Sequence, residues 1–260
     1  MQLMAVGQSD KLKVGAIIQA RMKSERLPGK ILMPLPFPKG KPLLWWIVNS
    51  VRQSKMIDKI VLASSVNKEN DPLVTFCNEN SLTLFRGNEE DVLSRFIQVS
   101  RQHELDIVVR LTGDNPIVDA SLLDRIISHH INNRNDYTKT EGLPMGMNFE
   151  VVSTSALYQI ENRSLSNEDT EHVTLYLRKS TEFKKEEIRL FEGEGLDAMR
   201  LTIDYPSDYA MMSMLLNLLQ DDELPVLDTI RKIRNQSPWL FAINDSNLQR
   251  QPLLKAHGTT

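Results

Sequence analysis

Short apolar, β-branched runs alternate with helix-like stretches along the first half of the chain. The runs that predict strands cover residues 14–20, 59–63, 82–85 and 106–111, and apolar residues at helical spacing predict helices over 43–51, 71–80, 89–102 and 119–131. Strands that alternate with helices at this spacing favour right-handed βαβ units and a parallel sheet covered on both faces. The first half is therefore predicted to be an α/β domain.

The second half of the chain has a looser pattern from about residue 132 onward. Further strands are expected at 148–152, 187–190 and 200–203, and helices at 168–178, 209–220 and 226–235. We expect one domain over residues 14–243 that contains an irregular insertion at about 132–198. A short N-terminal extension, 1–13, and a polar C-terminal tail, 244–260, would flank this domain.

Composition and charge narrow the class of protein. The 260 residues are 41% apolar and 25% charged, enough for a large core, which excludes a disordered scaffold. The net charge of −3 gives no basic excess of the kind that nucleic-acid or membrane binders carry. A single cysteine, Cys77, excludes an internal disulfide framework, and no apolar run is long enough for a signal peptide or a membrane span. These features predict a cytoplasmic protein.

The loop after the first predicted strand is dense with cations. Arg21, Lys23, Arg26 and Lys30 fall within ten positions, and Pro28-Gly29 marks a turn between them. Ligands of open α/β sheets bind beyond the carboxyl ends of the strands, where such a loop can wrap a polyphosphate. A solvated basic surface loop fits the composition equally well.

Two aspartates follow other predicted strands. Asp114 lies in Thr-Gly-Asp-Asn-Pro after the strand at 106–111, and Asp204 follows the strand at 200–203. Two carboxylates at strand ends of one sheet can share a Mg²⁺ ion, which keeps substrate phosphates among its ligands. Each aspartate alone is more often a helix cap or turn former. Together with the basic loop, they describe a nucleoside-triphosphate site.

The segment Gln-Ala-Arg-Met-Lys-Ser-Glu-Arg-Leu-Pro-Gly-Lys-Ile-Leu at 19–32 resembles the N-terminal signature of the cytidylyltransferase family. Within that family it is similar to the branch of spore coat polysaccharide biosynthesis protein F, whose relatives include the synthetases of CMP-Kdo and CMP-sialic acid. Further family-like segments follow in order at 63–65, 86–93, 111–116, 148–151, 171–174 and 200–206. The resemblance covers most of residues 14 to about 235.

The resemblance implies a three-layer nucleotide-diphospho-sugar transferase fold with a mostly parallel central sheet, and a role for each matching residue. Arg21, Ser24, Arg26 and Lys30 would bind the triphosphate of CTP, Arg21, Lys30 and Asp114 would be catalytic, and Asp114 and Asp204 would hold Mg²⁺. Ala63 to Ser65 would lie near the base, and Asn148, Glu150 and His172 would serve the acceptor, although a structural role for His172 has similar weight. Lys23 departs from the pattern, since the family usually has glycine there, and its side chain would restrict approach to phosphate or add a charge.

The function that the resemblance implies is Mg²⁺-dependent transfer of CMP from CTP to a sugar acid or similar acceptor, with pyrophosphate release, for surface polysaccharide or glycoconjugate synthesis. It also implies a homodimer built from the stretch after residue 132. One alternative is a glycosyltransferase with a nucleotide-sugar donor, although Asp114 is followed by Asn115-Pro116 and not by a second spaced aspartate. The other is a nucleotide-binding module without turnover, for which Lys23 is the only hint. The base and the acceptor stay open.

Overall fold

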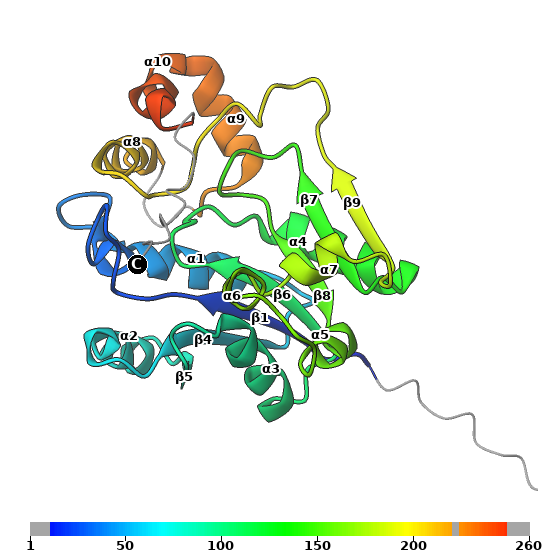
Figure 1. The fold of residues 1–260 in the computed structure, drawn as a ribbon. Helices are drawn as coiled ribbons and strands as arrows, with labels where there is room; N and C mark the ends of the chain where they lie inside the picture. Colours follow the sequence, from blue (N-terminus) through cyan, green and yellow to red (C-terminus); the bar gives the residue numbers. More distant parts are fainter. Residues whose placement is uncertain (1–10, 220–223, 249–260) are drawn as a thin grey trace, which may run out of the picture.

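The computed structural model describes residues 11–219 and 224–248. Seven strands form one sheet in the order β5-β4-β1-β6-β8-β7-β9, and β8 alone runs antiparallel to its neighbours (Figure 1). The strands are β1 (Val14–Gln19), β4 (Lys59–Ser65), β5 (Thr83–Gly87), β6 (Ile107–Thr112), β7 (Tyr137–Glu141), β8 (Glu150–Ser153) and β9 (Lys185–Arg189). The predicted mostly parallel central sheet is confirmed. A hairpin of β2 (Pro34–Leu35) and β3 (Lys41–Pro42) stands apart from it.

Helices cover both faces of the sheet (Figure 1). One face carries α1 (Leu43–Val51), α2 (Pro72–Glu79), α4 (Ala120–Asn133), α8 (Pro206–Leu216), α9 (Leu227–Gln236) and α10 (Pro238–Phe241). The other carries α3 (Val92–Gln102), α5 (Thr154–Ile160) and α7 (Leu175–Lys179), beside the short helix α6 (Asn167–Glu171). Short 3₁₀ helices lie at Lys30–Leu32, Lys68–Asn70 and Ala242–Asn247.

The alternation of side chains along the strands divides the core into two. In β1, Ala16 and Ile18 belong to the cluster under α1 and α4, whereas Ile17 belongs to the cluster under α3 and α5. All three are fully buried. A strand buried on both faces reads as a continuous apolar run, which is why the sequence predicted this strand so clearly.

The elements of the first half agree with the sequence predictions within a few residues, and α1 has the predicted bounds. Side-chain caps set two helix starts: Asp91 accepts a hydrogen bond from Ser94 N at 2.8 Å, and Asp119 accepts from Ser121 N and Leu122 N. These caps satisfy amide groups that a helix start leaves without partners.

The second half departs from the predictions at several elements. Residues 200–203 are not a strand of the sheet: they form an extended, buried segment with one parallel bridge from Arg200 to Met145. The helix predicted over 168–178 is two short helices, α6 and α7, because Val173 between them adopts a left-handed conformation with φ of 53°. Both β7 and α5 were missed; β7 reads Tyr-Thr-Lys-Thr-Glu, too polar to stand out from a loop.

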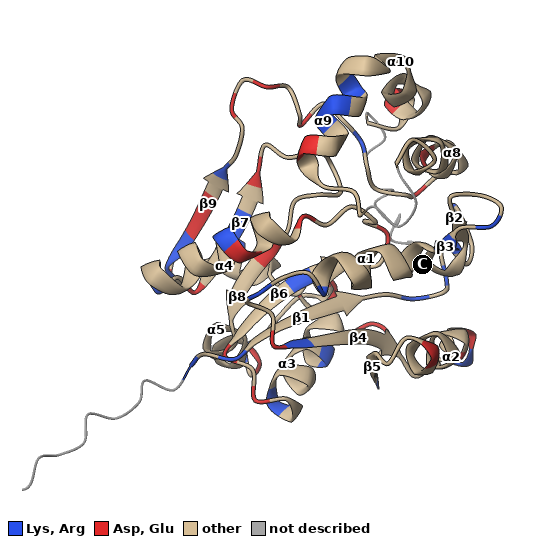
Figure 2. Ribbon diagram, turned by 180° about the vertical axis from the view of Figure 1, so that it is seen from behind, with Lys and Arg blue, Asp and Glu red and all other residues tan. Residues whose placement is uncertain are grey.

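Charges of both signs are spread over the ribbon, and both signs occur on β7 and β9 at one edge of the sheet (Figure 2). The predicted C-terminal tail begins with Asn244 and includes Asn247. Both side chains are buried and donate to the Asp208 carboxylate. Residues 249–260 and 1–10 lie outside the described residues. Over the described part of the chain, none of the helices is long and apolar enough to span a membrane.

Candidate active site

The basic loop leaves β1 at its carboxyl end and folds back on itself. Met22 N donates to Asn70 Oδ1 at 2.8 Å, and Gly29 N donates to Met22 O at 3.0 Å. Gly29 has φ of 71°, a left-handed conformation that glycine adopts without strain, and it leads directly into the 3₁₀ turn that begins at Lys30. The loop therefore carries Lys30 back to the sheet.

The Lys30 ammonium lies between the two predicted aspartates. Its Nζ is 3.0 Å from Asp114 Oδ2 and 3.0 Å from Asp204 Oδ1, and it donates to Ile203 O at 2.7 Å. Lys30 is only 7% exposed. The close packing of Gly113 against β1 makes this approach possible, since a Cβ there would lie 2.8 Å from Ala20 Cβ. The structure thus brings together three residues that are far apart in the sequence.

Asp204 is surrounded by cations. Besides Lys30, Arg26 Nη2 lies 2.9 Å from Oδ1 and Arg200 Nη2 lies 2.8 Å from Oδ2. Burial opposes ionisation, but the charge of Lys30, with Arg26 and Arg200, outweighs it and lowers the pKa of Asp204. Asp204 is therefore an ionised carboxylate whose charge is compensated by neighbours.

Arg200 is held in place by a second, fully buried carboxylate. Asp208 accepts from Arg200 Nε at 3.0 Å and from the backbone amides of Asp204 and Tyr205, both at 2.9 Å. Asp208 caps the start of α8 through these amides. The pair of Arg200 and Asp208 fixes the backbone that presents Asp204.

Asp114 and Asp204 are the carboxylates that a divalent cation would use, at the position where the Lys30 ammonium lies in this structure. Asp114 and Asp204 offer carboxylate oxygens to one position, and Thr112 Oγ1 orients Asp114 by donating to its Oδ1 at 2.7 Å. No group of three His, Cys, Asp or Glu side chains that could hold a metal occurs among the described residues. Two carboxylates leave positions open for substrate oxygens, as is usual for Mg²⁺ in phosphoryl-transfer sites.

The remaining cations of the loop are exposed. The Arg21 side chain is 52% exposed and lies 3.8 Å from Glu89. Lys23 points to solvent. Ser24 Oγ accepts from Leu27 N at 3.4 Å and so shapes the loop from within. Arg21 and Lys23 are thus exposed to solvent, while Lys30 is the buried cation of the loop.

The predicted base side lies at the carboxyl end of β4. Ala63 and Ser65 are buried, and Ser65 Oγ accepts from Asn70 Nδ2 at 2.7 Å. The same Asn70 accepts from Met22 N, so one buried side chain ties the basic loop to this strand end. Arg86 donates to three consecutive backbone oxygens, those of residues 65–67, and stiffens the following loop.

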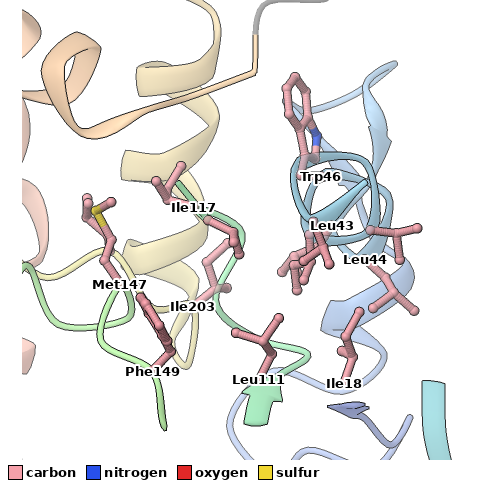
Figure 3. Close-up of a cluster of buried hydrophobic side chains, with 14 of the residues drawn as sticks. Ile18, Leu43, Leu44, Trp46, Leu111, Ile117, Met147, Phe149 and Ile203 are labelled. Atoms are coloured by element: carbon pink, nitrogen blue, oxygen red, sulfur yellow. The ribbon is translucent and has the colours of Figure 1, made fainter. Parts of the chain in front are cut away.

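A cavity of about 220 Å³ opens beyond β6 and β8. Asn148 lines it, and its Oδ1 is buried without a hydrogen-bond partner, while Nδ2 donates to Leu143 O. The apolar part of the lining comes from Leu111, Ile117, Val118, Leu122, Met147 and Phe149. Several of these side chains gather in Figure 3, facing α1 across the chain that follows β6.

Glu150 lies in the wall of this cavity, in a saturated network. Its carboxylate accepts from Arg110 Nη1 at 2.7 Å, from Tyr137 Oη at 2.6 Å and from Thr174 Oγ1 at 2.9 Å. Burial opposes ionisation, but Arg110 and the hydrogen bonds lower the pKa of Glu150. Burial next to this carboxylate raises the pKa of Tyr137. Glu150 thus holds three elements together around the cavity.

His172 lies apart from the cavity. Its side chain is exposed, it follows α6, and its backbone amide donates to Glu168 O at 3.0 Å. Thr174, two residues on, is the member of this family-like segment that reaches Glu150. A role of His172 toward the acceptor stays a prediction.

The sequence reasoning missed Arg110, Arg200 and Asp208. A signal for Arg110 was present, because a charged residue inside the apolar run Ile-Val-Val-Arg-Leu is expected to meet a buried partner. Arg200 had the same signal ahead of Leu-Thr-Ile. Asp208 looked like an ordinary first-turn helix residue, and only the fold reveals its partners.

Comparisons with known proteins agree with this geometry. The cytidylyltransferase family profile matches residues 15–240. The chain is 40% identical to the spore coat polysaccharide biosynthesis protein SpsF of Bacillus subtilis (strain 168), over 76% of this chain and 84% of that protein.

Two solved structures share the fold. A cytidylyltransferase from Leptospira borgpetersenii serovar Hardjo-bovis (strain JB197) superposes with a TM-score of 0.81 at 27% identity, covering 93% of this chain and 99% of the other. CMP:2-keto-3-deoxy-manno-octonic acid synthetase, solved in complex with CTP, superposes with a TM-score of 0.59 at 15% identity, covering 79% and 98%. The predicted resemblance is confirmed: this chain is a nucleotidyltransferase that belongs to the cytidylyltransferase family.

Proposed function

We propose that the protein transfers CMP from CTP to a sugar acid or similar acceptor and releases pyrophosphate, for surface polysaccharide or glycoconjugate synthesis. The observation that carries this proposal is the Lys30 ammonium held between Asp114 and Asp204 at the end of the basic loop. Cations and carboxylates that neutralise each other before the ligand arrives can exchange partners when a metal–triphosphate complex enters.

In this scheme the protein does little covalent chemistry. The acceptor hydroxyl oxygen attacks the α-phosphorus of CTP and gives up its proton to solvent, a P–O bond forms, and the bond from the α-phosphorus to the bridging oxygen breaks with its electron pair on pyrophosphate. Lys30 and Arg21 stabilise the negative charge on the leaving pyrophosphate, and Arg26 pairs with another phosphate oxygen. Positioning and charge compensation of this kind carry most of the rate in phosphoryl transfer.

Asp114 and Asp204 would hold Mg²⁺. When bound, the ion supplies charge neutralisation at the α-phosphate and helps to orient it. Thr112 and Arg200 keep the two carboxylates pointed at one position, through the contacts at 2.7 Å and 2.8 Å described above. These partners matter because a carboxylate that can rotate freely holds a metal less well.

The cavity beside Asn148 is the proposed acceptor site. Asn148 Oδ1 is a buried atom of the wall without a hydrogen-bond partner among the described residues, and a rotation of the side chain toward the cavity would let it accept a hydrogen bond from an acceptor hydroxyl. Glu150 already accepts three hydrogen bonds from the protein, so we assign it to positioning Arg110 and the cavity wall. This assignment modifies the predicted substrate-binding role of Glu150.

The test is a pyrophosphate-release screen of CTP, ATP, GTP and UTP with Mg²⁺ against a panel of sugar acids and sugar phosphates. The expected result is release with CTP that depends on both acceptor and Mg²⁺. Release of a nucleoside diphosphate from a nucleotide sugar would instead support a glycosyltransferase. Nucleotide binding with no pyrophosphate from any acceptor would support a binding module.

Two further parts of the proposal concern the state of the protein. We propose a homodimer formed through the irregular stretch 132–198, and a cytoplasmic location that suits the single cysteine. Sedimentation equilibrium of the purified protein tests the dimer. A monomer at micromolar concentration would contradict it.

A further inference from the structure

Arg95 is a buried cation near the phosphate loop that the proposed mechanism does not use. It lies in the first turn of α3 and is 5% exposed. Its contacts are long: Nη1 donates to Ala63 O at 3.4 Å and Nη2 to Glu89 O at 3.5 Å. The Nε atom is buried and has no hydrogen-bond partner. The guanidinium is therefore desolvated but poorly satisfied.

No carboxylate of the described residues forms an ion pair with Arg95 within 4.0 Å. The other arginines of the site each have a carboxylate close by: Arg26, Arg86, Arg110 and Arg200 at 2.7 to 3.0 Å and Arg21 at 3.8 Å. A buried charge without a partner is costly, and proteins rarely keep one unless a ligand completes it.

Arg95 lies at the carboxyl ends of the strands. Ala63 O, which accepts from Arg95, also accepts from Ala20 N at 3.2 Å, and Arg21 follows Ala20 directly. The charge of Arg21 reaches Arg95 strongly enough to add to burial in lowering the pKa of Arg95, against the opposing influence of Glu89 and Asp91. Two guanidinium groups from different elements therefore converge where an α/β sheet binds its ligands.

Gly87 makes room for this side chain. A Cβ at residue 87 would lie 2.8 Å from Arg95 Cγ and 2.9 Å from Phe85 Cε1. The φ of Gly87 is not in the left-handed region, so its lack of a side chain serves the space around Arg95 and Phe85. The fold thus keeps a place for a buried arginine beneath the basic loop.

We propose that Arg95 binds a phosphate of the nucleotide from beneath, opposite Arg21. This inference rests on the proposed function, and it adds a cation from outside the basic loop to the triphosphate site. The phosphate replaces the long contacts to Ala63 O and Glu89 O with charge-assisted hydrogen bonds, which are shorter and stronger. Binding also brings Arg95 the negative charge that its surroundings lack.

The test measures binding of inorganic tripolyphosphate and of CTP by calorimetry in the presence of Mg²⁺, so no turnover is needed. The variants are Arg95→Met, Arg95→Lys and Gly87→Ala, and the control is Arg101→Met on the same helix, whose guanidinium meets Glu161 at the surface. Thermal unfolding confirms that each variant is folded.

Arg95→Met is expected to weaken both ligands by about 10- to 100-fold, since it removes hydrogen bonds between charged groups. Gly87→Ala should also weaken binding of both ligands, because it displaces Arg95. Arg95→Lys should weaken binding less than Arg95→Met does. Arg101→Met should bind both ligands like the wild type. The lysine and alanine variants keep the test informative if Arg95→Met does not fold.

Unchanged tripolyphosphate binding in folded Arg95 variants would overturn the inference while leaving the proposed function intact. A loss with CTP but not with tripolyphosphate would place Arg95 at the base or ribose and would also overturn it. Failure of the wild-type protein to bind either ligand would count against both the inference and the proposed function.

Discussion

The two ends of the site satisfy their charges in different ways. At the proposed phosphate end, Lys30 is shared by two carboxylates, Asp204 is shared by three cations, and Arg95 forms no ion pair with a carboxylate of the described residues. At the proposed acceptor end, Glu150 has a separate donor for each contact and Arg110 is paired with it. The first arrangement can exchange partners with a ligand, while the second has nothing to exchange.

This difference separates residues that would bind the ligand from residues that stabilise the fold. Carboxylates and cations that share partners lose little electrostatic stabilisation when a metal ion and a triphosphate bind between them. Each carboxylate gains the metal as a new partner, and each cation gains a phosphate. A saturated buried network pays a large penalty for losing any member. Substitutions at the phosphate end should therefore affect turnover, and those at the acceptor end should affect stability.

The largest effect is expected for Asp114→Ala. Loss of a carboxylate that would hold Mg²⁺ should reduce pyrophosphate release by at least about 1,000-fold while the protein stays folded. Asp106→Ala is the matched control, because Asp106 precedes the same strand at its opposite end and accepts from Lys13 N. Near-normal turnover in Asp114→Ala, measured beside the control, would remove the basis of the proposed function.

Lys30→Met tests the exchange of partners directly. Turnover should fall by about 100- to 1,000-fold, since a cation that stabilises pyrophosphate is gone. Metal binding without nucleotide should become tighter, because Asp114 and Asp204 no longer share an ammonium. Mn²⁺ titration followed by electron paramagnetic resonance measures this gain.

Lys23→Met serves as the control for Lys30→Met in the same loop. Lys23 is exposed, and we expect its loss to change turnover by no more than about threefold, as for a screened surface charge. Equal losses in the two variants would mean that the loop acts through its total charge. Unchanged Mn²⁺ affinity in Lys30→Met would show that the carboxylates are not competing for Lys30.

Features that depend on local sequence pattern could be predicted, and contacts between distant segments could not. The strands and helices of the first half follow from apolar runs and periodicity, Asp114 is a candidate from its place after a strand, and Lys30 is a candidate from the basic loop and the family resemblance. The sequence could not show that residues 200–203 bridge to Met145 outside the sheet, because a buried extended segment and a strand have the same apolar pattern. Nor could it show the partners of Glu150, which come from β6, β7 and the chain after α6.

Glu150→Gln tests the acceptor end. The substitution leaves the partly buried Arg110 without a counter-ion inside a network whose Glu150 is buried, so the free energy of unfolding should fall by about 3 kcal/mol, measured by urea denaturation at pH 7. Glu161→Gln is the control, because it breaks the pair with Arg101 at the surface and should leave the unfolding curve unchanged within error. An unchanged unfolding curve in Glu150→Gln with a large loss of turnover would move Glu150 into the catalytic machinery.

The last expected effect is a pH dependence of stability, and it concerns His130. His130 is fully buried on α4, and its ring nitrogens contact Thr138 Oγ1 at 2.9 Å and Ser153 Oγ at 3.1 Å, on β7 and β8. Burial lowers its pKa from 6.5 to about 4, with Asp136 opposing the shift and His129 adding to it. Between about pH 6.5 and pH 4 the imidazole of His130 is therefore neutral in the folded protein and protonated in the unfolded chain.

Because the folded-state pKa is the lower one, the stabilising contribution of His130 is complete above pH 6.5 and is lost as the pH falls toward 4. The loss amounts to about 3 kcal/mol in the free energy of unfolding over that window. The ionised carboxylates with lowered pKa, including Asp204 and Glu150, lose their contributions only below about pH 4, so the two windows separate. Urea denaturation between pH 7 and 4.5 should show this slope in the wild type and a flatter one in His130→Gln. His129→Gln changes the neighbouring ring and should retain most of the slope. An equal slope in the wild type, His130→Gln and His129→Gln would contradict the prediction, because it would mean that burial does not lower the pKa of His130.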